Sequence, residues 1–384
     1  MLTRQRVISY GIPTAAAATI VAAALLTSGG RQSLLANPGK PTPIVPSHVV
    51  SGSHRIDVVF AVDTTGSMGG LLDGAKRTVW SIATHIRKTD PNADLRIGLV
   101  AYRDVGDDYV TKPFLLTTDL DAVYSELATY QASGGGDTPE DVDAALDDSL
   151  HKMPWRADAK KLVFLVGDAP PASRGEVPRF DVLAREASET GIVINAIRCG
   201  VDNETASTFQ RIASLGRGEF STIHQDGGVQ QIATPYDDKL AELSSQIDRT
   251  AMVVGDDSVR TRWEGKMAAA EAAPAAAKAD RAAYYANGAT GGMKRGEDDL
   301  VGGVATGTMT VDGVDPESLP ADMRGKDKAE VKAEIDRRVA ERRTLQNQVE
   351  DLTRQREDFL LKQAKGGEAG FDEAVKATVD KQIK

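Results

Sequence analysis

An apolar run at residues 59–68, VFAVDTTGSM, ends in a cluster of side chains that carry oxygen. Asp63, Thr65 and Ser67 occupy alternate positions in it. Carboxylate and hydroxyl oxygens are the ligands that a small, hard cation such as Mg²⁺ prefers. Taken alone, the cluster has a simpler explanation, because a serine at this point also suits the start of a helix. The segment is therefore a candidate cation site that needs further ligands.

Two later segments carry donors of the same kind. Thr138 lies in GGGDTPED at 134–141, and Asp168 lies in VGDAPP at 166–171. Each also has a simpler interpretation, since a threonine followed by proline and acids is typical of a helix N-cap, and an aspartate before prolines is typical of a turn. The three segments together favour one divalent-cation site, for Mg²⁺ first and for Mn²⁺ or Ca²⁺ as alternatives. Its expected ligands are Asp63, Thr65, Ser67, Thr138 and Asp168.

The order of apolar runs predicts the elements that bring these segments together. Short runs rich in Val, Ile and Leu alternate with stretches of helical periodicity, which is the pattern of a doubly wound α/β sheet with helices on both faces. Ligands of such sheets bind beyond the carboxyl ends of the strands. Residues 109–118 are expected to form an edge strand, because Pro113 cannot donate a hydrogen bond within a central ladder. The other expected strands are residues 56–62, 95–102, 161–167 and 191–197.

Three further residues lie near the expected site. Asp104 follows the second expected strand, and Asp137 and Gly66 lie next to expected ligands. They are expected either beside the ion or in contact with a partner. For Asp104 an exposed loop carboxylate is the simpler interpretation, and for Asp137 it is a brace of the glycine-rich turn.

The segments VDTTGSM, GGGDTPED and VGDAPP resemble the metal-ion-dependent adhesion site (MIDAS) of the von Willebrand factor type A domain. The resemblance covers residues 55–256 and departs from the family pattern at Thr65, where serine is more common. It implies a Rossmann-like sheet in which the hydroxyls contact the ion and the two aspartates bind it directly or through water. An acidic side chain of a protein partner then completes the coordination, which implies metal-dependent binding in adhesion or assembly. The C-terminal part is similar, more loosely, to tails of bacterial proteins with this domain.

The sequence carries no catalytic signature. D-T-T-G-S has one residue more than the aspartic-protease motif and no second copy, and GGLLDGAKRT has Ala75 at the position of the P-loop lysine. The five histidines show no metal-ligand spacing. A binding module is therefore favoured over an enzyme. Two alternatives stay open: a Mg²⁺-dependent hydrolase, and a scaffold that binds through its C-terminal helix while the metal only stabilises the fold.

Composition and the N-terminal residues indicate where the protein acts. The formal net charge of −10 disfavours nucleic acid as a partner. Residues 1–30 are expected to be a signal peptide or an N-terminal membrane anchor, with 7–28 as the membrane tether. Residues 31–54, rich in Pro, Gly and Ser, are expected to be a linker. These features predict an extracytoplasmic protein, either periplasmic or secreted, or anchored to the cytoplasmic membrane.

The C-terminal third changes composition twice. Residues 257–320 are rich first in Ala and then in Gly and are expected to be a partly flexible linker, whereas 321–384 are expected to be helical. A long helix is predicted at 328–363, where an apolar seam suggests coiled-coil pairing. Because charged residues break the seam, the helix is expected to fold back on the chain or to associate with another helix. The interrupting residues are Arg338, Arg342 and Arg356.

Overall fold

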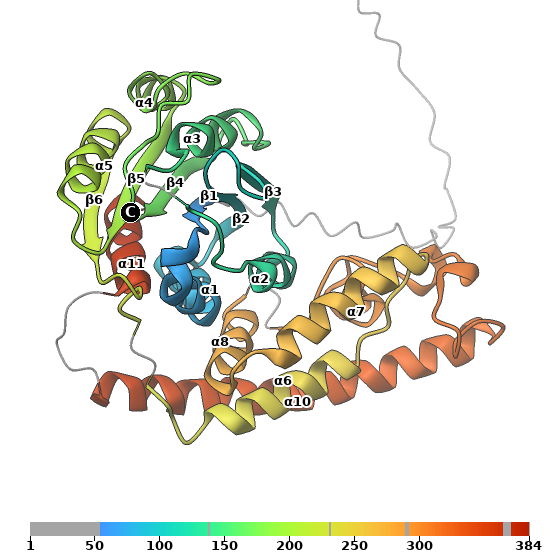
Figure 1. The fold of residues 1–384 in the computed structure, drawn as a ribbon. Coiled ribbons are helices and arrows are strands. Elements are labelled where there is room, and N and C mark those ends of the chain that lie inside the picture. The colour runs from blue at the N-terminus through green and yellow to red at the C-terminus, as the bar shows by residue number, and fades with distance from the viewer. Residues whose placement is uncertain (1–53, 137–138, 230–231, 289–291, 364–369, 384) are drawn as a thin grey trace, which may run out of the picture. The chain divides into compact units, whose positions relative to one another are not determined.

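The structure of the chain is a computed structural model (Figure 1). The expected leader at 1–30 with its tether at 7–28, the linker up to residue 53, and both Asp137 and Thr138 lie outside the described residues. In the part that the structure describes, no helix has both the length and the apolar character needed to cross a bilayer. The described residues are 54–136, 139–229, 232–288, 292–363 and 370–383.

One six-stranded sheet forms the centre of the fold. Its strands are β1 (His54–Asp63), β2 (Ala93–Tyr102), β3 (Thr111–Thr117), β4 (Lys160–Gly167), β5 (Ile192–Cys199) and β6 (Arg217–Ile223). They lie in the order β3-β2-β1-β4-β5-β6, and all pairings are parallel except that of β2 with β3. The four expected inner strands are present, and the strand that contains Pro113 lies at an edge, as predicted.

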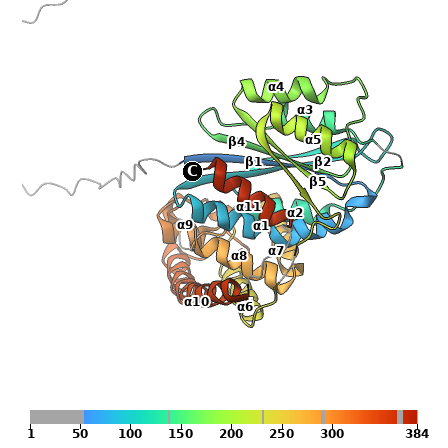
Figure 2. The same cartoon turned by 90° about the vertical axis from the view of Figure 1, so that its left-hand side faces the viewer.

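Helices cover both faces of the sheet, which confirms the predicted fold class (Figure 2). The central strands are continuous apolar runs because helices bury each face of the sheet. A short 3-10 turn, Gly66–Met68, leads from β1 into α1. One face is covered by α1 (Gly69–Thr89), α2 (Leu120–Thr129) and α11 (Phe371–Gln382), and the other by α3 (Val142–His151), α4 (Phe180–Glu189) and α5 (Asn203–Leu215).

The helix α11 joins the sheet from the C-terminal end of the sequence. Its residues Phe371, Val375 and Val379 are buried, and the ring of Phe371 lies 6.1 Å from that of Phe60 on β1. The sequence assigns these residues to a separate C-terminal helical region, whereas the structure packs them against α1, β5 and β6. The physical reason is their apolar face, which completes the core on that side of the sheet.

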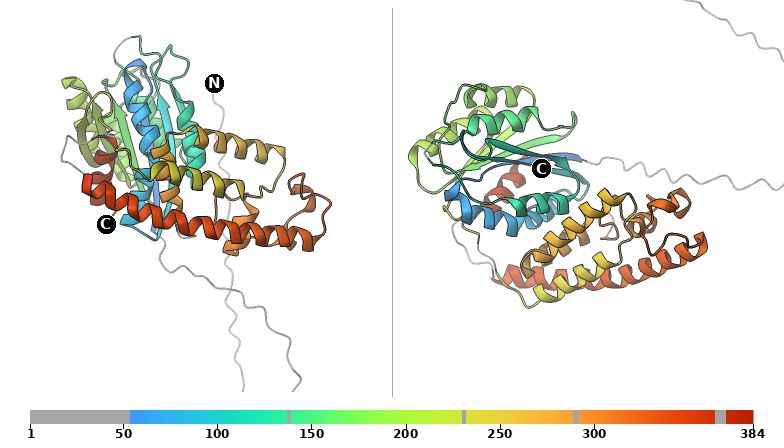
Figure 3. Two further views of the ribbon diagram at one scale, coloured as in Figure 1. Left: turned by 90° about the horizontal axis from the view of Figure 1, so that it is seen from below. Right: turned by 45° about the vertical axis from the view of Figure 1, so that its right-hand side comes forward.

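The stretch between β6 and α11 forms a second group of helices, which we call the helical layer. It consists of α6 (Asp237–Arg249), α7 (Asp257–Ala272), α8 (Ala275–Ala286), α9 (Leu300–Thr306) and α10 (Lys328–Gln363). The long helix α10 runs along α6 and also contacts α8 and α9, so it folds back on the chain (Figure 3). The sequence places α6 in the domain at 55–256 and residues 257–320 in a linker. In the structure α6, α8 and α10 share one core, since Leu240, Ala279 and Val349 are buried together.

The arginines that interrupt the seam of α10 contact other parts of the helical layer. Arg342 is fully buried and bonds to Asp299, which is also fully buried. Arg356 is ion-paired with Asp280 at 2.6 Å. Arg338 donates to a backbone carbonyl, that of Ala251, at 3.0 Å. These side chains therefore attach α10 to its neighbours instead of weakening a coiled coil.

Candidate metal centre

Strand β1 ends at Asp63, whose side chain is fully buried at the carboxyl edge of the sheet. Its Oδ1 accepts hydrogen bonds from the backbone N–H of Thr65 at 2.9 Å and from the Thr65 hydroxyl at 2.7 Å. Its Oδ2 is buried and has no hydrogen-bond partner in the described part of the chain. Burial raises the pKa of Asp63 to about 7, against the lowering effect of the Thr65 hydrogen bonds, and the charge of Asp168 raises it further.

Two hydroxyls follow Asp63 at the same edge. The Oγ1 of Thr65 lies 3.4 Å from the Oγ of Ser67. Ser67 is exposed, and no side chain caps the start of α1, so the simpler role of Ser67 as a helix cap does not apply. The intervening Thr64 turns away, because its hydroxyl donates to the carbonyl of Tyr102 at 3.0 Å. The alternation read from the sequence thus places one carboxylate and two hydroxyls together.

Backbone hydrogen bonds join the three segments that carry the expected ligands. The N–H of Gly66 donates to the carbonyl of Gly134 at 3.2 Å, which ties the end of β1 to the glycine-rich segment. The N–H of Glu140 donates to the carbonyl of Pro170 at 3.1 Å, which ties that segment to the turn after β4. The fold therefore brings the segments to one edge of the sheet, as their positions after parallel strands predict.

The glycine-rich segment needs glycine for both conformation and space. Gly134 and Gly135 have φ values of 80° and 71°, which L side chains rarely adopt. A Cβ at Gly135 would also lie 2.8 Å from the Cβ of Thr65 and 2.9 Å from Oε1 of Glu140. This close approach carries the chain past Thr65 towards Thr138, whose own position lies outside the described residues.

Asp168 follows β4 and is bridged to the first segment by a glutamine. The side-chain amide of Gln225, just after β6, donates to Oδ2 of Asp168 at 2.5 Å and to the carbonyl of Ser67 at 3.3 Å. The sequence did not indicate Gln225, because it belongs to no motif and its partners lie far from it in the chain.

Glu140 is a second residue that the sequence did not assign to the site. It is 4% exposed, and its Oε2 is buried without a hydrogen-bond partner among the described residues. Burial raises its pKa to about 8, and the charge of Asp63 adds to this shift. From the sequence, Glu140 is predicted to be an acid in the first turn of a helix whose N-cap is Thr138. In the structure α3 starts later and its N-cap is Asp141, which accepts from the N–H of Ala144 at 2.9 Å.

The three accessory residues have different outcomes. Asp104 is 3% exposed and binds the guanidinium of Arg174 through both carboxylate oxygens, so the expectation of an exposed loop carboxylate is wrong. The burial of Asp104 requires this pairing, because an unpaired buried carboxylate is costly. Gly66 is exposed and supports the glycine-rich segment through its N–H. Asp137 lies outside the described residues.

The residues at this edge fit a divalent cation. Buried carboxylate oxygens normally have a hydrogen-bond donor or bind a metal, and Asp63 and Glu140 each have one oxygen without a donor among the described residues. In the same part of the chain no three His, Cys, Asp or Glu side chains are grouped as a metal site. The side chains at this edge combine carboxylates with hydroxyls, and such a mixed set suits a hard ion such as Mg²⁺.

Comparison with known proteins identifies the domain. A family model described as the von Willebrand factor A domain matches residues 57–234. The von Willebrand factor A domain-containing protein 7 of Rattus norvegicus is 33% identical over 127 residues, which is 33% of this chain and 13% of that protein. The alpha-protein kinase vwkA of Dictyostelium discoideum is 28% identical over 137 residues, 32% of this chain and 19% of the kinase. The match thus spans less than a fifth of either relative, and residues 57–234 form a von Willebrand factor A domain.

Solved structures with a similar fold cover a little under half of the chain. The protein BatB of Bacteroides thetaiotaomicron is 15% identical, with a TM-score of 0.35, over 44% of this chain and 90% of BatB. The proximal thread matrix protein 1 of the mussel byssus, solved with zinc in its MIDAS motif, is 16% identical, with a TM-score of 0.36, over 45% of this chain and 43% of that protein.

Proposed function

We propose that this von Willebrand factor A domain is a metal-dependent protein-binding module for adhesion or assembly. A divalent cation, with Mg²⁺ favoured, would be held at the sheet edge and would bridge to an acidic side chain of a protein partner. The observation that carries the proposal is the pair of buried carboxylate oxygens, on Asp63 and Glu140, that have no hydrogen-bond partner among the described residues, near the exposed Ser67.

The residues have separate roles in this proposal. Thr65 and Ser67 would offer hydroxyls to the ion together with Thr138, and Asp63 and Asp168 would bind or orient it. When bound, the ion supplies the positive charge that attracts a partner carboxylate. Gln225 would hold the turn at Asp168 against the Ser67 segment, as its two hydrogen bonds do in the structure.

The surface around the site supports a protein partner. Two large apolar side chains are exposed in loops at this edge: Val105, which is 49% exposed, and Val201, which is 87% exposed. A hollow of about 590 Å³ extends from Gln225 between Val201 and Arg198. Apolar side chains at the centre of a contact surface are buried on binding, while its polar rim stays accessible to solvent.

Partner capture with and without the metal tests the proposal. The immobilised protein is incubated with a lysate of its source cells in Mg²⁺ or in EDTA, and retained proteins are identified by mass spectrometry. We expect a set of partners that is lost in EDTA and with Asp63→Ala. The matched control is Asp158→Ala, an exposed carboxylate paired with Arg55 at the opposite edge of the sheet. The proposal fails if a still-folded Asp63→Ala protein retains the same partners in EDTA as the wild type does in Mg²⁺.

The scaffold alternative is better tested by a point substitution than by a deletion. Deleting residues 321–384 would remove α11 from its place against α1, β5 and β6 as well as α10. A substitution on the open side of α10, such as Leu361→Ser at a residue that is 76% exposed, changes that helix alone. Loss of partners with Leu361→Ser but not with Asp63→Ala would favour the scaffold. No hydrolase is proposed, and a kinase that matches over 19% of its length lends no activity to this chain.

An extracytoplasmic location belongs to the same proposal and rests on residues 1–30 alone. It predicts that a tag at the C-terminus is digested when protease is added to cells with a permeabilised outer surface and an intact cytoplasmic membrane. Protection of the tag under those conditions would place the domain in the cytoplasm instead.

A further inference from the structure

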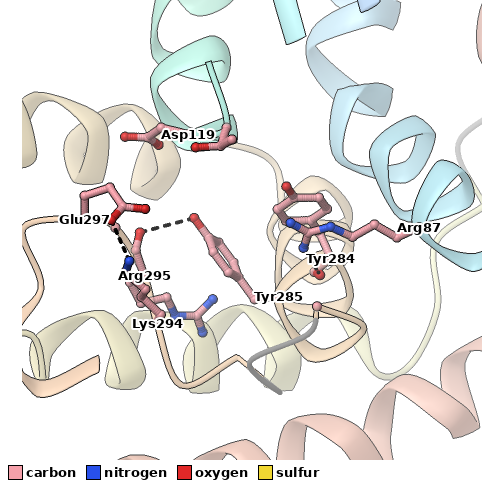
Figure 4. A pocket seen from close by; sticks show the side chains of 10 residues that line it. Arg87, Asp119, Tyr284, Tyr285, Lys294, Arg295 and Glu297 are labelled. Atoms are coloured by element: carbon pink, nitrogen blue, oxygen red, sulfur yellow. Dashed lines mark hydrogen bonds and ion pairs between the residues drawn. The ribbon is translucent and has the colours of Figure 1, made fainter. Parts of the chain in front are cut away.

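A cavity of about 200 Å³ lies between the sheet domain and the helical layer (Figure 4). Its walls come from the last turn of α1, the turn between β3 and α2, the end of α8 and residues 294–297. Three positive side chains from two of these segments line it, together with two tyrosines and two acids. The positive residues are Arg87, Lys294 and Arg295.

The two acids in the wall are already neutralised. Asp119 accepts from Lys266 at 2.6 Å, and this lysine is not itself part of the cavity wall. Glu297, whose side chain is 82% exposed, pairs with Lys294 at 2.6 Å. Each acid thus has a lysine of its own, so neither compensates the two arginines.

Arg87 faces the cavity from α1 without a carboxylate partner among the described residues. Its guanidinium stacks on Tyr284, 3.8 Å from the ring centroid, and donates to the carbonyl of the same tyrosine at 3.2 Å. A Cβ at Gly288 would lie 2.9 Å from its Nη1, so the glycine leaves room for the group. Stacking and a single hydrogen bond leave most of its donors unused, although a guanidinium offers five.

Arg295 lies behind the second tyrosine. It is 1% exposed and stacks on Tyr285, 4.2 Å from the ring centroid, as Figure 4 shows. None of its three guanidinium nitrogens has a hydrogen-bond partner in the described part of the chain. The Oδ1 of Asp248 lies 3.5 Å from Nε, but Asp248 also pairs with Arg281 at 2.7 Å. Burial lowers the pKa of Arg295, which shows how poorly its charge is compensated.

We propose that this cavity binds a small oxyanion, a phosphate or a carboxylate group, which Arg87 contacts and the buried charge of Arg295 stabilises. Arg87 has the planar fork that matches such anions, and Lys294 can exchange its exposed partner Glu297 for the ligand. The ring of Tyr285 separates Arg295 from the anion, so Arg295 does not contact the anion and attracts it only electrostatically. Such an attraction is strong where water is excluded. The volume exceeds that of several water molecules, at about 30 Å³ each, so a small anion fits.

Because of where the cavity lies, a bound anion would affect how the helical layer is attached to the sheet domain. Arg87 belongs to the sheet domain, whereas Tyr284, Tyr285 and Arg295 belong to the helical layer. A bound anion would neutralise positive charge on both sides of this junction. It would therefore stabilise the attachment of the helical layer, and the expected effect is independent of the metal site.

Titration of the full chain with inorganic phosphate tests the proposal. Calorimetry is carried out in EDTA at constant ionic strength, so that a cation at the sheet edge cannot bind phosphate. We expect saturable binding that weakens about tenfold or more with Arg87→Met, because a charge-assisted bidentate contact is lost. The matched control is Arg179→Met, which removes an arginine that also stacks on an aromatic ring, Phe180, far from the cavity in sequence.

Two further measurements keep the test decisive. Acetate is titrated in parallel, and binding of acetate but not phosphate would assign the cavity to a carboxylate. Arg295→Met should raise the melting temperature in anion-free buffer, since it removes a buried guanidinium that has no hydrogen-bond partner among the described residues, and should weaken the binding of the anion. The proposal is overturned if neither anion binds saturably, or if Arg87→Met binds both as the wild type does.

Discussion

The sheet edge and the helical layer both bury charged side chains, but they surround them differently. At the sheet edge, Asp63 and Glu140 each keep one buried oxygen that has no hydrogen-bond donor in the part of the chain that the structure describes. In the helical layer, Arg342 bonds to Asp299, to the hydroxyl of Thr250 and to a backbone carbonyl. The surroundings of Arg342 are thus complete within the chain, whereas each of the two carboxylates keeps an oxygen that a ligand could bind.

This difference separates a binding site from an architectural contact. A buried charge costs free energy unless partners replace the water it has lost. Arg281 of α8 binds Asp121 of α2 at 2.6 Å, with both side chains almost fully buried, so a complete pair also attaches the helical layer to the sheet domain. Carboxylates left incomplete at a strand end indicate a ligand from outside, which a substitution in each region can test.

The largest effect on stability is expected in the helical layer. Arg342→Ala should lower the free energy of unfolding by about 3–5 kcal/mol, because it leaves the buried carboxylate of Asp299 without its partner. Urea denaturation followed by circular dichroism measures the change. The control is Arg337→Ala on the same helix, whose side chain is 59% exposed and pairs with the partly exposed Glu334 and the exposed Glu341, so its loss should cost much less. Equal losses for the two variants would contradict an architectural role for the buried pair.

The pH dependence of stability should distinguish the sheet edge from the helical layer. The pKa of Asp63 is about 7 in the folded chain, above its ordinary value, so the folded protein holds a proton that the unfolded chain has released between about pH 4 and 7. Without metal, stability should therefore fall as pH rises through this window, by up to about 1.4 kcal/mol per pH unit for this group. Mg²⁺ favours the ionised carboxylate and should oppose the fall.

Melting temperatures at pH 5 and pH 8, in EDTA and in Mg²⁺, measure this prediction. Stabilisation by Mg²⁺ should be larger at pH 8 and should reach about 2.7 kcal/mol at a concentration of one hundred times the dissociation constant. Asp63→Asn should remove both the pH slope from this group and the response to Mg²⁺. A response to Mg²⁺ that survives in Asp63→Asn would place the cation elsewhere.

The sequence predicts the sheet and part of the site for a clear physical reason. Strands buried on both faces are continuous apolar runs, and parallel strands end at one edge, so Asp63 and Asp168 could be placed together before the structure was known. The alternation in VFAVDTTGSM also predicts that Thr64 turns away from Thr65, which the hydrogen bond to Tyr102 confirms.

Other features depend on contacts that no local pattern encodes. The apolar face of α11 is visible in the sequence, but nothing in it says that the partner is a sheet that begins about three hundred residues earlier. In the sequence, Arg342 and Arg356 only interrupt the apolar heptad pattern of α10. Their ion-pair partners, Asp299 and Asp280, lie far away in the chain and cannot be recognised from that pattern. Glu140 follows a proline as a helix-start acid would, and only the later N-cap of α3 shows that it precedes the helix.

The smallest effect is expected for Glu140→Gln, which tests whether the second incomplete carboxylate belongs to the metal site. Burial and the charge of Asp63 raise the pKa of Glu140 to about 8, so the ionised form destabilises the metal-free protein at high pH. Gln keeps the shape and cannot ionise, so stability in EDTA at pH 9 should rise relative to the wild type. Affinity for Mg²⁺, measured by calorimetry, should fall less than with Asp63→Asn, because Asp63 and the hydroxyls are still present. If the variant changes stability in EDTA but leaves the affinity for Mg²⁺ unchanged, Glu140 is a buried acid of the fold and Asp63 alone supplies the incomplete charge at this edge.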